Sequence, residues 1–135
     1  MVTVFPLVFD ATVFQQATAF NGDLSKWQTS TVTVMRGIFY IATAFNGDLS
    51  KWQISRVTNM QSTFHSAKAF NGDLSKWQTS AVINIANAFQ DTTAFNGDLS
   101  KWKTSRVTHM DKTFYNAKSF NHKTTLDIAW GANSP

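Results

Sequence analysis

The chain has 135 residues, a length that suits one domain and leaves little room for a second. Its 43% apolar content, with 12 Phe and 5 Trp, excludes a solvated disordered tail, and the absence of Cys excludes a disulfide scaffold, a Cys zinc site and a Cys nucleophile. The net charge of +4 comes partly from evenly spaced lysines rather than from a basic block, so we expect no nucleic-acid partner.

The first elements along the chain are an apolar start and half of a repeat. Met1 to Phe9 has neither a basic flank nor a cleavage signature, so we do not expect a signal peptide. No apolar run in the chain reaches the roughly 18 residues that cross a membrane, which predicts no membrane insertion. Phe14 and Ala17 are in register with the unit described next, so residues 1–19 are interpreted as a degenerate half-coil.

A period of 25 residues organises the centre of the chain. The block from Phe20 to Trp27 (FNGDLSKW) returns unchanged three times, and each copy is followed by a looser half with apolar residues at fixed offsets. Such a period indicates units that stack, because one unit cannot bury its own apolar face. The predicted repeats of this single domain, 1–135, are residues 20–44, 45–69, 70–94 and 95–119.

Each unit predicts an extended first half and a helical second half. The Asn-Gly-Asp of the block is a turn signal, and the stretch from Leu24 to Val32 suits one short strand. Met35, Phe39 and Ala42 follow the spacing of one helical face, i, i+4 and i+7. The helices are expected near residues 34–42, 59–67, 84–92 and 109–117.

These elements predict the fold class. A coil of 25 residues with one strand and one short helix falls in the length range of leucine-rich repeats. We therefore predict an α/β solenoid, leucine-rich-repeat-like and right-handed, with a β-helix as the alternative.

The last segment, residues 120–135, is a degenerate end. It begins a fifth unit with Phe120 and then loses the pattern, and Trp130 comes three residues late. Atypical ends are typical of a capped stack and equally of a piece of a longer array. Capped ends favour a monomeric binder, whereas open ends favour end-to-end association into filaments.

The repeated residues resemble a known repeat family. The pattern Phe-Asn-x-Asp-Leu-Ser-x-Trp, then Thr-Ser-x-Val-Thr-x-Met and Phe-x-x-Ala, is similar to the BspA-type surface repeat over about residues 7–121. That repeat is also called the mycoplasma lipoprotein-associated repeat or domain of unknown function 285. Its members usually have Gln at the position of Gly22 and a second Met or a Met-Phe pair before the helix aromatic, where this chain has Ile38. The resemblance implies a leucine-rich-repeat-like fold on secreted or surface-anchored proteins, an adhesion or interaction role, and no catalytic residue.

Two charged columns are candidate ion sites. The Asp column could hold calcium, but one Asp per coil supplies few oxygens, so we expect each Asp to accept N–H bonds in its own turn. The Lys column could bind an acidic glycan or a phosphate backbone, although a solvated stripe is favoured because exposed ion pairs are worth only about 0–1 kcal/mol. The columns are Asp23, Asp48, Asp73 and Asp98, and Lys26, Lys51, Lys76 and Lys101.

Three further columns are interpreted as structural. The Trp column recurs at the same 25-residue interval as the apolar columns, which favours a core ladder over a platform for sugar rings. The Asn column, from Asn21 to Asn121, predicts amide bonds between adjacent coils. A Thr array around Thr31 could order ice, but Arg56 and Arg106 interrupt that face.

The remaining chemistry-bearing residues indicate no enzyme. His65, His109 and His122 lie in three different columns, without carboxylates at metal-ligand spacing, which predicts no metal site and no catalytic triad. No phosphate-binding or dinucleotide fingerprint occurs, so we expect no cofactor.

The position after the core Phe of each second half differs between units and is our candidate binding surface. It is expected to face away from the core on the predicted helices, where a stacked repeat would present a ligand surface. The residues are Tyr40, His65, Gln90 and Tyr115. The predicted function is a non-enzymatic extracellular or cell-surface module for adhesion or for protein or glycan interaction; the alternative is a structural subunit that self-associates into filaments.

Overall fold

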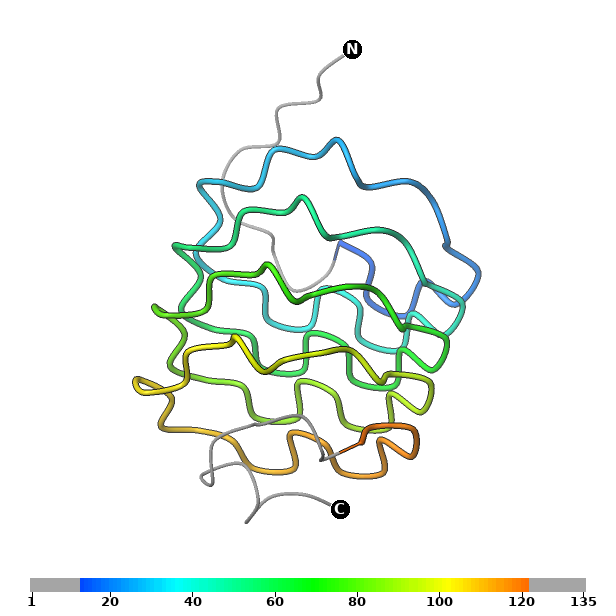
Figure 1. Ribbon diagram of the computed structural model, residues 1–135. Coiled ribbons are helices and arrows are strands. Elements are labelled where there is room, and N and C mark those ends of the chain that lie inside the picture. The colour runs from blue at the N-terminus through cyan, green and yellow to red at the C-terminus, as the bar shows by residue number, and fades with distance from the viewer. Residues whose placement is uncertain (1–12, 122–135) are drawn as a thin grey trace.

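Successive coils of the chain lie one above the next in the computed structural model, which describes residues 13–121 (Figure 1). In this described part, β pairing consists of isolated parallel bridges, each joining a residue to the residue 25 positions further on. The bridges join Val34 to Asn59, Asn59 to Asn84, and Asn84 to His109. The predicted end segments 1–12 and 122–135, with His122 and Trp130, lie outside the described residues.

The predicted α/β solenoid is wrong. Residues 13–121 contain no helix, and consecutive turns occupy the segments 34–42, 59–67, 84–92 and 109–117 where helices were expected. The predicted strands are wrong as well, since the bridges stay isolated and do not extend into a sheet; this also overturns the β-helix alternative. No helix in residues 13–121 is long and apolar enough to cross a membrane.

The backbone hydrogen bonds of these turn segments show why no helix forms. The N–H groups of Gly37, Phe39 and Ile41 donate to carbonyl oxygens of the next coil at 2.8–2.9 Å. The N–H groups of Tyr40 and Ala42, in alternation, close turns with the carbonyl three residues back. An α-helix would need each of these amides to bond four residues back within its own segment. Because the two kinds of bond alternate, every second amide donates to a carbonyl of the next coil, and these bonds hold the coils together.

Positive φ angles also exclude a helix. Two positions in each unit have φ between 54° and 64°, and each is the third residue of a turn, the place where a type II turn requires positive φ. The first position holds Gly37, Ser62, Asn87 and Lys112. The second holds Gln16, Ile41, Ser66, Asp91 and Asn116.

Replacing Ile41 by Asn is expected to stabilise the protein. Ile41 has φ of 57°, a conformation that β-branched residues rarely adopt, whereas Asn tolerates it and already occupies the equivalent position at Asn116. Ile41→Asn should therefore raise the free energy of unfolding by about 1 kcal/mol, measured by urea denaturation.

Ile83→Asn is the matched control. Ile83 is half-buried like Ile41 but does not have positive φ, so this substitution should leave stability unchanged or lower it. An equal decrease in the free energy of unfolding in both variants would show that backbone strain at Ile41 is not significant.

The core consists of aromatic and aliphatic columns that follow the stack, as the sequence predicts. Two Phe columns stack from coil to coil, with ring centroids 5.4–5.5 Å apart in one column and 5.9–6.0 Å apart in the other. Within a coil, the two Phe rings lie 4.1–4.4 Å apart. The members are Phe14, Phe39, Phe64, Phe89 and Phe114, and Phe20, Phe45, Phe70, Phe95 and Phe120.

Each repeated block needs glycine because a larger residue would not fit there, and not because of its φ angle. Gly72 does not have positive φ. A Cβ at Gly72 would lie 2.8 Å from the ring of Phe70, which is fully buried in its column and cannot easily move. The ring therefore packs directly beneath the backbone of the block.

Candidate functional site

The Asn column is a structural ladder, as predicted. The side-chain Oδ1 of each Asn accepts the backbone N–H of the Asn in the next coil at 2.8–2.9 Å. These four bonds join Asn21, Asn46, Asn71, Asn96 and Asn121. Amide oxygens used in this way bind the coils to one another rather than a ligand.

The Asp column also has the predicted structural role. Asp23, Asp48, Asp73 and Asp98 each accept the backbone N–H of the Ser two residues further on at 2.8–2.9 Å. Hydrogen bonds from that Ser hydroxyl and N–H lower the pKa of each carboxyl below its ordinary 3.8, and the Lys three residues on adds to the lowering. Within residues 13–121, no group of three or more His and Asp side chains could hold a metal ion.

The Trp column lies in the core, which confirms the prediction of a ladder. The indole N–H groups of Trp52, Trp77 and Trp102 donate at 3.0 Å to the carbonyl of the block leucine in the preceding coil, 28 residues back. These side chains are only 2–7% exposed. Their ring faces are covered and cannot act as a platform for sugar rings.

The four predicted binding residues lie together in one row, although on turns rather than on helices. We call Tyr40, His65, Gln90 and Tyr115 the variable row. Their carbonyl oxygens accept N–H bonds of 2.7–2.8 Å from the preceding coils, which fixes the spacing of the row. The Tyr115 side chain is 52% exposed and the other three are half-buried.

Polar side chains of the neighbouring column support the variable row. The Tyr40 ring meets the His65 ring edge-on at 5.0 Å, and His65 Nε2 lies 3.7 Å from Asp91 Oδ2. Asn116 Nδ2 donates to Asp91 Oδ1 at 2.6 Å, and Asn87 Nδ2 donates to Gln90 Oε1. Burial lowers the pKa of His65 below 6.5, opposed by the Asp91 carboxylate, so the imidazole is neutral at pH 7.

The sequence analysis missed the pairing of His65 with Asp91. The two residues are 26 positions apart, and they meet because Asp91 occupies the column next to His65 in the following coil. The fixed period could have revealed this pair, since each residue neighbours those about 25 positions away.

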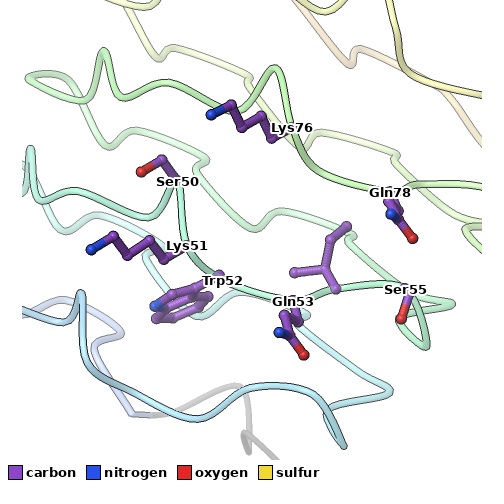
Figure 2. A pocket seen from close by; sticks show the side chains of 8 residues that line it. Ser50, Lys51, Trp52, Gln53, Ser55, Lys76 and Gln78 are labelled. Carbon is purple, nitrogen blue, oxygen red and sulfur yellow. The ribbon is translucent and has the colours of Figure 1, made fainter.

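A second surface consists of three successive hollows, which we call the basic groove, and Figure 2 shows the lining of the middle one. Each hollow is lined by the segment that follows Ser-Lys in one coil and by a Lys of the next coil. Figure 2 shows Lys51 and Lys76 extending in the same direction from adjacent coils, and Gln53 and Gln78 further along the same two segments. The volumes are about 260, 390 and 580 Å³ in chain order.

The ladders and the two surfaces define a repeat protein whose 25-residue coils stack through side-chain and backbone bonds. The chain belongs to the family described as Mycoplasma protein of unknown function, DUF285, whose family model matches residues 10–130. This match confirms that the repeated motif indicated domain of unknown function 285, and it does not extend to the BspA-type or leucine-rich-repeat-like detail of the resemblance. Comparison with curated proteins and with solved structures found no match.

Proposed function

We propose that this protein is a non-enzymatic interaction module, extracellular or on the cell surface, that binds a protein or glycan partner. The observation that supports this function is the variable row. Its side chains change from coil to coil, whereas the Asn, Asp and Trp columns repeat unchanged. The Asn and Trp side chains bond adjacent coils, and each Asp holds the turn of its own coil. Variable side chains on a rigid periodic frame are the usual binding surface of stacked repeats.

The physical properties of the row suit binding. Tyr40 and Tyr115 stand at its two ends, and tyrosine is enriched in interfaces because a rigid ring supplies both apolar area and a hydroxyl. The backbone bonds along the row and the Asp91 contacts hold it in place before a partner arrives, which reduces the entropy lost on binding.

The carboxylates support a non-enzymatic role. The Asp column is ionised at neutral pH, because its hydrogen bonds lower the pKa of each carboxyl below 3.8. Such groups cannot donate a proton near pH 7 and are weak bases, so they are poorly matched to general acid–base catalysis.

The test is a binding screen with a double variant. The purified chain is immobilised on a biosensor and exposed to a panel of extracellular-matrix proteins and cell-surface polysaccharides. We expect a partner whose affinity falls at least about tenfold in Tyr40→Ala/Tyr115→Ala, because a tyrosine that a partner covers often contributes more than about 1 kcal/mol.

Thr31→Ala/Ser105→Ala is the control, since both residues are exposed and lie outside the variable row. It should bind like the wild type. Unchanged affinity in the tyrosine variant, or no binding to any member of the panel, would argue against the proposal.

The alternative function, a subunit that associates end to end, depends on the end coils. Residues 1–12 and 122–135 lie outside the described residues, so filament formation stays a prediction from the sequence, to be checked by electron microscopy of the purified chain.

A further inference from the structure

We infer that the basic groove is a second binding site, separate from the variable row, and that it binds an anionic polysaccharide of linked uronate sugars. Its lysines would contact the carboxylates of successive sugars, and its glutamine and serine side chains would contact the hydroxyls. This inference does not depend on a partner of the variable row.

The groove repeats once per coil. The three hollows are lined by equivalent segments that begin at Trp27, Ser50 and Ser75. Lys51 lines the first and second hollows, and Lys76 lines the second and third, so that consecutive hollows share a cation. An extended ligand could therefore occupy all three hollows in one direction along the stack.

The charges of the groove have one sign. The third hollow adds Lys101 and Lys103, and no Asp lines any of the three. In residues 13–121 the contact within 4.0 Å between a basic side chain and an Asp oxygen is that of the neutral His65 with Asp91, so no groove lysine has a carboxylate oxygen at that distance. The Asp of each block, such as Asp73, instead accepts the N–H of its own Ser75. These exposed ammonium groups attract an anionic chain, because the Asp three residues before Lys51, Lys76 and Lys101 interacts with each of them electrostatically without direct contact.

The covered Trp rings distinguish among anionic polymers. Single-stranded nucleic acids bind through base stacking on exposed aromatic faces, and neutral sugars also favour such platforms. Trp52 and Trp77 line the second and third hollows but are only 3% and 2% exposed, and their indole N–H groups are bonded to carbonyls. The groove thus offers cations, amides and hydroxyls, which match carboxylates and sugar hydroxyls.

The block lysines recur once per coil, as carboxylates recur once per sugar in a uronate polymer. Stacked Trp rings of adjacent coils lie 6.3 Å apart beside the groove, for Trp27 with Trp52 and for Trp77 with Trp102. A 1,4-linked uronate polymer has one carboxylate on every sugar ring. The flexible four-carbon stem of each Lys can accommodate the difference between the coil step and the sugar length.

The experiment measures binding of polygalacturonate to the full chain by isothermal titration calorimetry. Lys51→Gln/Lys76→Gln/Lys101→Gln removes three of the four groove lysines and leaves Lys103. Lys68→Gln/Lys112→Gln/Lys118→Gln is the matched control, because it changes the net charge equally at exposed lysines outside the groove. Thermal unfolding of both variants checks that they fold like the wild type.

We expect the groove variant to bind at least about tenfold more weakly and the control to change less than about threefold. Methyl-esterified polygalacturonate, which lacks the charges, should not bind, and the affinity of the acid form should fall as salt increases. Tyr40→Ala/Tyr115→Ala should retain binding, which separates this site from the variable row.

Three results would overturn the inference. An equal loss of affinity for polygalacturonate in both lysine variants would show that only the net charge matters. Equal binding of the methyl ester would show that the carboxylates are not recognised. Binding of oligothymidylate as tight as that of polygalacturonate would identify the groove as a nucleic-acid site instead.

Discussion

Phe64→Ala is expected to lower the free energy of unfolding by about 3–5 kcal/mol. The Phe64 ring is fully buried and stacks on Phe70 at 4.2 Å, on Phe39 at 5.5 Å and on Phe89 at 5.4 Å. The backbone bonds between coils hold these neighbours apart, so the cavity left by the missing ring cannot collapse. Since small domains are stable by only about 5–15 kcal/mol, this one ring accounts for a large part of the total.

Urea denaturation followed by tryptophan fluorescence measures this loss. Tyr115→Ala is the control, because it removes an aromatic ring that is 52% exposed and should change stability by about 0.5 kcal/mol or less. The loss of stability in Phe14→Ala should lie between those of the other two variants. Phe14 is half-buried and stacks on one column neighbour, Phe39. A loss at Phe64 no larger than that at Tyr115 would show that the Phe columns do not determine stability.

The fixed period made the columns predictable. With no insertion between Phe20 and Phe120, residues 25 positions apart must be neighbours in adjacent coils, so burial of the Phe and Trp columns follows directly. The Asn ladder and the Asp turns were predictable for the same reason, because each type of residue has one preferred way to bond in a repeated turn.

The conformation within a coil was not predictable from apolar spacing. Met35, Phe39 and Ala42 are all fully buried, as a helical face would require, but a chain of turns buries the same positions. The choice depends on hydrogen bonds to the next coil, which one unit's pattern does not contain. Turn-forming residues such as Gly37 and Asn87 in the predicted helix interiors were the available signal.

The variable row and the lysine column of the basic groove could be found from the sequence, but the contacts that support the row and the hollows between the lysines could not. In the sequence, the row is a repeat position at which the residue differs between units. The contact of His65 with Asp91, and the sharing of Lys51 between two hollows, depend on which side chains of adjacent coils lie opposite each other. That information comes from the stacking of coils and becomes available only with the fold.

Deletion of one whole unit, residues 38–62, is expected to leave a folded chain. Gly37 is then joined to Thr63, its equivalent successor, and every column stays in register with one coil fewer. The N–H of Gly37 would meet the carbonyl of Ala86, which accepts the equivalent bond from Ser62 in the intact protein. Because each coil contributes similar burial, the urea dependence (m value) should fall in proportion to the lost surface, with a single cooperative transition.

Deletion of residues 38–61 removes one residue fewer and is the matched control. The additional Ser62 lies within the segment where amides alternate between turn bonds and bonds to the next coil, so a shift by one residue directs each following amide to the wrong partner. This variant should be about 3 kcal/mol less stable than the 38–62 deletion, or should lose its cooperative transition, in the same urea experiment followed by circular dichroism. If both deletions unfold alike, the stack would tolerate loss of register, and its stability would come from general apolar burial rather than from aligned columns and alternating backbone bonds.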